Sequence, residues 1–283
     1  GGDNSSCADC AGAPNGSASV DNCGVCDNNN DNNCGDLNSD GFTNVNDILI
    51  VVDYILYNTN INENQIEAAD LNQDESIDVQ DVVALVDQIL GVQLSRGKSA
   101  TEVSLLYGNG NVRYESDGDL AGFQFMVEGD YNIISRYIPK GWELVLSDEV
   151  ILLYSLDGSS LNDSKLFDYE GELNIRSIIT SDWYGSDIST SSIIIPKNYA
   201  LLPVYPNPFN PVTNINFTVP VDCDVSIEIY NIQGRKVASL LSGNINAGAH
   251  SLLWDANTYT SGLYFAKMTS KEFTQLQKIM LLK

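Results

Sequence analysis

Two acidic segments carry the residue types and spacing that most clearly predict chemistry. The first is a twelve-residue stretch with oxygen-bearing side chains at positions 1, 3, 5, 9 and 12, namely Asp36, Asn38, Asp40, Asn44 and Asp47. Gly41 is its sixth residue, and Phe42 would contribute its backbone carbonyl at position 7. Alternate residues of a tightly curled loop point inward, and Ca²⁺ prefers hard oxygen ligands. The spacing therefore predicts a calcium site.

A second stretch repeats this pattern. Its side chains at the same five positions are Asp70, Asn72, Asp74, Asp78 and Asp81, and the Ser76 carbonyl would occupy position 7. The sixth residue is Glu75 rather than glycine. A residue with a side chain is strained there by roughly 1 kcal/mol or more, so we expect this second site to be weaker or differently closed. Chance Asp- and Asn-rich turns are the alternative interpretation of both segments.

The elements that must position these loops repeat as well. An apolar helix is expected after each loop, at Ile48 to Leu56 and at Val82 to Leu90, and the units recur with a period of 70 − 36 = 34 residues. Two in-phase loops that end in Asp, each followed by an apolar helix, resemble a dockerin type I domain over residues 36–94.

The resemblance implies calcium-dependent folding and binding to a cohesin-like module. It also places recognition at loop positions 10 and 11, which here are Val45, Asn46, Val79 and Gln80. These residues differ from the Ser–Thr pairs of cellulosomal dockerins, which leaves the partner open.

Residues 1–35 are polar and contain Cys7, Cys10, Cys23, Cys26 and Cys34. Such crowding predicts disulfides in an oxidising compartment, with a four-thiolate zinc site as the alternative. The acidic, Cys-bearing string resembles thrombospondin type 3 calcium repeats, which implies further calcium here. Cys223 stands apart, either as a buried free thiol or as the partner of an N-terminal cysteine.

Residues 100–200 alternate between apolar and polar positions with the period of two that is typical of strands, for example from Ala121 to Val127. They predict a β-sandwich, and the segment resembles a cohesin. One chain would then carry both halves of an interaction, which allows either docking within the chain or head-to-tail association into a homopolymer. The expected fold class is multi-domain and mainly β, with one small helical domain followed by two β-sandwiches.

Within residues 203–283, the string YPNPFNPVT starts at Tyr205, and Tyr230, Gly234, Trp254-Asp255, Gly262-Leu263-Tyr264 and a terminal Lys follow. These landmarks resemble the type A sorting domain of the Bacteroidetes type IX secretion system. The resemblance implies a small β-sandwich that the secretion machinery recognises. It places the protein in the extracellular space or on the outer-membrane surface of a Gram-negative bacterium.

Composition excludes several classes of partner. The formal net charge of −24 argues against nucleic acid and anionic membranes, because phosphate binding needs clustered Lys and Arg. The apolar run from Ile48 to Leu56 is interrupted by Asp53, so no transmembrane segment is expected. The chain begins at Gly1 without an initiator Met, which suggests a matured product or a fragment.

Nothing in the sequence predicts catalysis. The single histidine, His250, lies in a strand-like segment, and no nucleophile elbow, phosphate loop or HExxH pattern is present. We therefore expect a secreted or cell-surface calcium-binding adhesion or assembly protein that is not an enzyme. The alternative is the anchoring and export region of a larger secreted polysaccharide hydrolase.

Overall fold

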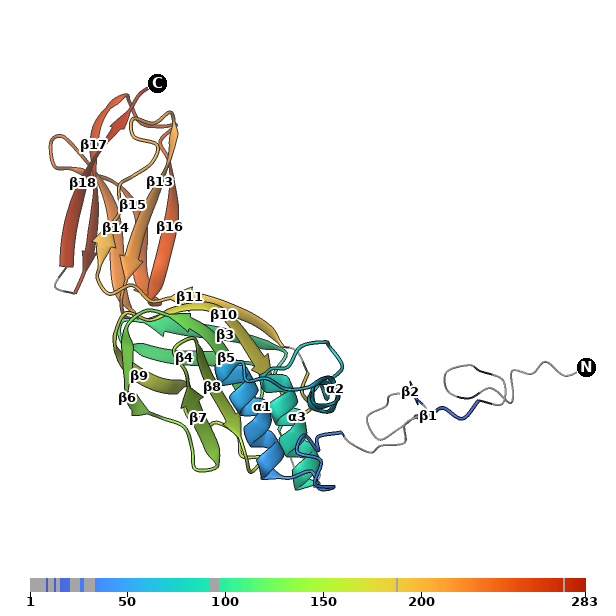
Figure 1. Cartoon of the computed structure of the whole chain (residues 1–283). Coiled ribbons are helices and arrows are strands. Elements are labelled where there is room, and N and C mark those ends of the chain that lie inside the picture. Colours follow the sequence, from blue (N-terminus) through green and yellow to red (C-terminus); the bar gives the residue numbers. More distant parts are fainter. Residues whose placement is uncertain are drawn as a thin grey trace, which may run out of the picture. The chain divides into compact units, whose positions relative to one another are not determined.

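The computed structural model describes residues 9, 13, 16–20, 26–27, 34–91, 97–186, 188–271 and 273–283. The chain forms two compact units, Gly1–Ser104 with Tyr114–Ser191 and Leu105–Arg113 with Ser192–Lys283 (Figure 1). Helices occur in the first unit, and the described parts of both units contain β-sheets. No helix among the described residues is long and apolar enough to span a membrane.

Three helices make up the helical module, which we define as residues 34–91. They are α1 (Val45–Tyr57), α2 (Glu63–Ala69) and α3 (Val79–Leu90). Helices α1 and α3 begin three residues earlier than the apolar pattern predicts, because the ninth residue of each loop, Asn44 or Asp78, is the N-cap. Both N-termini are closed by a capping box whose other member is the loop's twelfth residue.

The middle β-sandwich consists of two sheets, with strand orders β10-β5-β8-β7 and β11-β3-β4-β9-β6. Its strands are β3 (Glu102–Gly108), β4 (Asn111–Ser116), β5 (Gly122–Glu128), β6 (Tyr131–Arg136), β7 (Trp142–Leu146), β8 (Val150–Ser155), β9 (Lys165–Gly171), β10 (Asn174–Ser181) and β11 (Ser189–Ile194). A separate two-stranded pair joins β1 (Ser19–Val20) and β2 (Cys26–Asp27). Every residue of β8 is buried, so both faces of this strand are covered.

One hydrophobic core joins the helical module to the sheet β10-β5-β8-β7. Val52 of α1 and Val86 of α3 belong to the same buried cluster as Leu152 of β8 and Trp183. Figure 1 shows α1 and α3 beside this sheet. The helical module therefore packs on the β-sandwich of its own chain, which is one of the two arrangements that the sequence left open.

The second unit contains the C-terminal β-sandwich. Its sheets have orders β12-β13-β16 and β15-β14-β17-β18. The strands are β12 (Ala200–Leu201), β13 (Val212–Val219), β14 (Cys223–Asn231), β15 (Lys236–Ile245), β16 (Gly248–Asp255), β17 (Gly262–Ser270) and β18 (Phe273–Leu281). Burial alternates along β13 and β14, as expected for antiparallel sheets with one face on a core. The expected multi-domain, mainly β fold is confirmed.

Cys223 is a buried free thiol whose sulfur lies 3.0 Å from the Ser270 hydroxyl oxygen. Of the two alternatives for this cysteine, the free thiol is confirmed. The disulfides, the zinc site and the additional calcium expected in residues 1–35 fall largely outside the described residues and stay predictions.

Candidate calcium loops

The first loop is folded around the carboxylates of its first and last residues. The two oxygens of Asp36 accept backbone N–H groups from Asp40 (3.1 Å) and Gly41 (2.9 Å). Those of Asp47 accept from Asn38 (3.1 Å) and Asn44 (2.9 Å). Gly41 has φ +87°, the left-handed conformation that closes the curl.

The second loop has the same hydrogen-bond pattern around its first and last carboxylates. Asp70 accepts from the N–H groups of Asp74 and Glu75, both at 3.1 Å. Asp81 accepts from those of Asn72 (3.4 Å) and Asp78 (3.0 Å), as Asp47 does from the equivalent residues of the first loop, and also from that of Leu71 (2.8 Å). Glu75 takes φ +67° where the first loop has glycine. This loop is therefore closed in the same way as the first, and Glu75 carries the strain that the sequence predicted.

The ligands expected at positions 3 and 5 are paired with each other in both loops. The amide nitrogen of Asn38 donates to a carboxylate oxygen of Asp40 at 3.0 Å, and that of Asn72 donates to Asp74 at the same distance. At position 7, the Phe42 carbonyl accepts from the Asn44 side chain at 3.0 Å. The backbone N–H of Ser76 donates to Asp74 at 2.8 Å. Each loop thus brings its predicted ligands onto one short curl of chain.

The donor chemistry fits a hard cation such as Ca²⁺, because the residues at the ligand positions offer only carboxylate, amide and carbonyl oxygens. Among the described residues, no three His, Cys, Asp or Glu side chains are close enough to form a metal-binding group by themselves. The Asn side chains and backbone carbonyls would therefore have to complete each site. The twelve ligand assignments stay predictions.

Buried carboxylates in the helical module supply the electrostatic reason for a cation. Asp47 and Asp81 are fully buried, and burial raises the pKa of Asp81 to about 7. No Lys or Arg precedes Arg96 in the sequence, so the usual cationic side chains are absent from both loops. A bound cation would favour the ionised form of Asp81.

The two recognition positions have different surroundings in the two loops. Val45 and Asn46 of the first loop are exposed, whereas Val79 and Gln80 of the second are buried. The second pair is covered by the middle β-sandwich, where Gln124 of β5 accepts the Val79 N–H through its side-chain oxygen at 3.0 Å, a contact that the sequence pattern did not predict. A buried Gln within the apolar segment Ala121 to Val127 is the signal that could have indicated a polar contact there.

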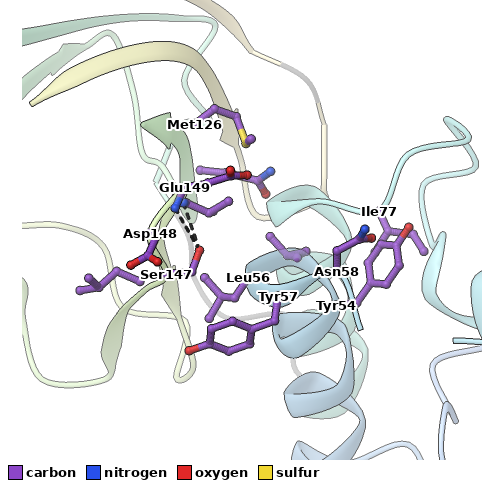
Figure 2. A pocket seen from close by; sticks show the side chains of 13 residues that line it. Tyr54, Leu56, Tyr57, Asn58, Ile77, Met126, Ser147, Asp148 and Glu149 are labelled. Carbon is purple, nitrogen blue, oxygen red and sulfur yellow. Dashed lines mark hydrogen bonds between the residues drawn. The ribbon is translucent and has the colours of Figure 1, made fainter. Parts of the chain in front are cut away.

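A pocket of about 750 Å³ borders this contact, where the C-terminal end of α1 faces the turn between β7 and β8 (Figure 2). Tyr54 and Tyr57 line it from the helix, and Asp148 and Glu149 line it from the turn. The Ser147 hydroxyl shapes the turn by accepting the N–H groups of Glu149 and Val150 at 3.4 and 3.2 Å. The pocket lining contains two acidic residues and no basic one.

Two parts of the chain match known protein families. Residues 34–90 match the dockerin type I domain. Domains of this type typically bind calcium, and they imply a cohesin-type protein partner. Residues 203–282 match the secretion system C-terminal sorting domain, which indicates type IX secretion to the cell surface or extracellular space in Bacteroidetes. The resemblances to cohesins and to thrombospondin type 3 repeats stay predictions.

Similarity to individual proteins is low. No curated protein matches the chain. Among solved structures, dimeric latent PorU from Porphyromonas gingivalis has 12% identity and a TM-score of 0.27 over 65% of this chain and 19% of that chain. PorZ from the same organism's type IX secretion system has 10% identity and a TM-score of 0.23, over 61% and 33%. Scores this low establish no shared fold, and the chain spans only a minor part of both proteins.

Proposed function

We propose that the protein is a non-catalytic, calcium-dependent assembly component of the bacterial surface, whose dockerin domain binds a cohesin-type β-sandwich on another protein. The dockerin and sorting domains support secretion and interaction with another protein. How that protein is bound depends on which face of the helical module remains free.

The observation that carries this proposal is the asymmetry of the duplicated module. Val45 and Leu49 of the first loop–helix unit, residues 36–57, are each 53% exposed, and Phe42 beside them is 73% exposed. Shifted by the repeat period of 34 residues, Val45 and Leu49 correspond to Val79 and Val83, which are buried at 0% and 1%. We call Phe42, Val45, Asn46 and Leu49 the first-unit face.

The covered face suggests what the free face binds. In the second loop–helix repeat, the equivalent apolar residues Val79 and Val83 lie in a core shared with the sheet β10-β5-β8-β7. Because the two units repeat the same loop–helix design, the first-unit face presents an apolar surface suited to another β-sheet face. Its exposed apolar side chains supply the contact area, and the surrounding acidic loops favour a partner with basic residues at the rim.

The single histidine has a packing role that agrees with a non-catalytic protein. The ring of His250 stacks on Phe217 with centroids 5.2 Å apart, and its Nε2 lies 2.8 Å from the Asn246 carbonyl oxygen. This position is on β16 of the C-terminal β-sandwich.

Site-specific photo-crosslinking on cells tests the proposal. A photoreactive residue at Val45 should give calcium-dependent crosslinks to a protein that contains a cohesin-type module, whereas the same residue at Leu253, which is 63% exposed on β16, should give none. Leu49→Asp should abolish the crosslink and leave the helical circular dichroism unchanged. Equal crosslinking with and without a chelator, or none from Val45, would refute the proposal.

A further inference from the structure

The middle β-sandwich makes direct polar contacts with the second loop. The N–H of Val79, the first residue of α3, has no acceptor within the helix and donates to Gln124 Oε1. The side-chain nitrogen of Asn72 donates to Gln80 Oε1 at 2.8 Å and lies 3.4 Å from the carbonyl oxygen of Gly185. The contacts therefore reach loop position 3 as well as position 10, which lies between the predicted ligands Asp78 and Asp81.

Two glycines of the β-sandwich allow this close approach. A Cβ added to Gly122 of β5 would lie 2.6 Å from Val79 Cγ2 and 3.0 Å from Val83 Cγ2. One added to Gly185 would lie 2.9 Å from the Gln80 carbonyl oxygen. The start of α3 is therefore in tight contact with the sheet, and there is no space for an extra methyl group.

The first loop provides an internal comparison. Asn38 holds the position of Asn72, yet among the described residues its side-chain nitrogen donates only to Asp40 of its own loop. Val45, at the position of Val79, is exposed. The same loop–helix design thus occurs once against the β-sandwich and once without it.

We propose that Gln124 is a positioning residue for the second calcium loop, and that docking of the middle β-sandwich on α3 is coupled to calcium binding there. The proposal rests on the calcium-dependent function proposed above. Gln124 holds the backbone of Val79, which lies between the ninth and twelfth loop residues. It therefore fixes the positions of the Asp78 and Asp81 side chains at the start of α3. By linkage, calcium in this loop strengthens docking as much as docking strengthens calcium binding.

Calcium titration calorimetry on the full chain tests the coupling. Asp36→Ala isolates the second loop, and Asp70→Ala isolates the first. Gln124→Met removes the acceptor at nearly the same side-chain length, and in the chain carrying Asp36→Ala it should raise the calcium Kd about fivefold or more. Gln124→Glu keeps an acceptor oxygen and should retain the affinity. In the chain carrying Asp70→Ala, Gln124→Met should change the Kd by no more than about twofold, as for independent sites.

A steric pair checks the same coupling without touching a polar group. Gly122→Ala should weaken calcium binding by the second loop alone, because the new methyl group pushes α3 away from β5. Val79→Ala in the same chain removes the closer of the two clashing methyl groups and should restore binding. This rescue also shows that Gly122→Ala has not simply unfolded the β-sandwich, which circular dichroism would check directly.

The outcomes separate this proposal from the one on which it rests. If Gln124→Met and Gly122→Ala both leave the second loop's affinity unchanged while the wild-type chain binds calcium, the coupling is refuted and the assembly function stands. If the wild-type chain binds no calcium in either loop, the proposed function fails first. Hydrogen exchange supplies a reciprocal readout, because removing calcium from the chain carrying Asp36→Ala should speed exchange in β5.

Discussion

The strained residue of the second loop offers the most direct test of the physical argument. Glu75 has φ +67°, whereas the equivalent Gly41 has φ +87°. A left-handed conformation costs a residue with a Cβ about 1–2 kcal/mol, and glycine's greater freedom in the unfolded chain offsets about 0.4–1 kcal/mol of the gain. We therefore expect Glu75→Gly to raise the free energy of unfolding by about 0.5–1 kcal/mol.

Urea unfolding of the full chain, followed by the circular dichroism of its helices, measures this effect. The midpoint should rise while the dependence on urea stays constant, since no additional surface is buried. The measurement belongs in saturating calcium, where both loops are closed in the folded state.

Two matched variants separate backbone strain from charge. Glu75→Gln removes the negative charge and keeps the strain, so it should not reproduce the gain. Gly41→Ala introduces the strain into the first loop, and because its Cβ would have nothing within 4 Å, the expected loss of about 1 kcal/mol is conformational.

If Glu75→Gly stabilised the chain no more than Glu75→Gln, backbone strain at Glu75 would be refuted. No effect of Gly41→Ala on unfolding would refute it as well. In either case the left-handed position would not limit closure of the loops, and the sixth residue could not explain any difference in affinity between them.

Three further outcomes follow from packing and charge. Leu85→Ala should destabilise the helical module and the middle β-sandwich by about 2–5 kcal/mol in urea unfolding, because Leu85 is fully buried in the core that they share. The Lys98 side chain and the N–H groups of Thr101 and Glu102 hold the pKa of Asp117 well below its ordinary value. Its contribution to stability is therefore present at neutral pH and lost only as pH falls below about 4, and a carboxyl NMR titration with and without Lys98→Ala checks this. Cys223, only 3% exposed, should react with a thiol reagent far more slowly than an unfolded control, as followed by mass spectrometry.

The sequence was most informative where the structure is determined locally. The spacing of Asp36 through Asp47 predicted a curled loop, and the carboxylate-to-backbone hydrogen bonds show this curl. The bonds join residues at most nine positions apart, so the local sequence is enough to predict them. The alternation from Ala121 to Val127 predicted a strand that the structure shows as β5. Helix α2 was missed although Asn62 and Gln65 form a capping box, because seven residues are too few to show an apolar period.

Contacts between distant segments could not be predicted in the same way. The bond from Val79 to Gln124 joins residues 45 positions apart, and its formation depends on which face of the module meets the sheet. Both repeats have an apolar residue at the positions of Val45 and Leu49, so the pattern did not predict which of them the sheet covers. The middle β-sandwich packs on the second loop–helix repeat and leaves the first exposed, and only the folded chain shows this choice.

The loop with the strained sixth residue is the one that the β-sandwich contacts. A strained backbone position persists where surrounding contacts over-determine it. The second loop has such contacts through Asn72, Val79 and Gln80, which meet Gly185 and Gln124 of the β-sandwich. The first loop lacks them and keeps Gly41, which needs no outside support to close the turn. Weakening the contact through Gln124→Met should therefore make the second loop more dependent on its sixth residue, so that Glu75→Gly stabilises that variant more than it stabilises the wild-type chain.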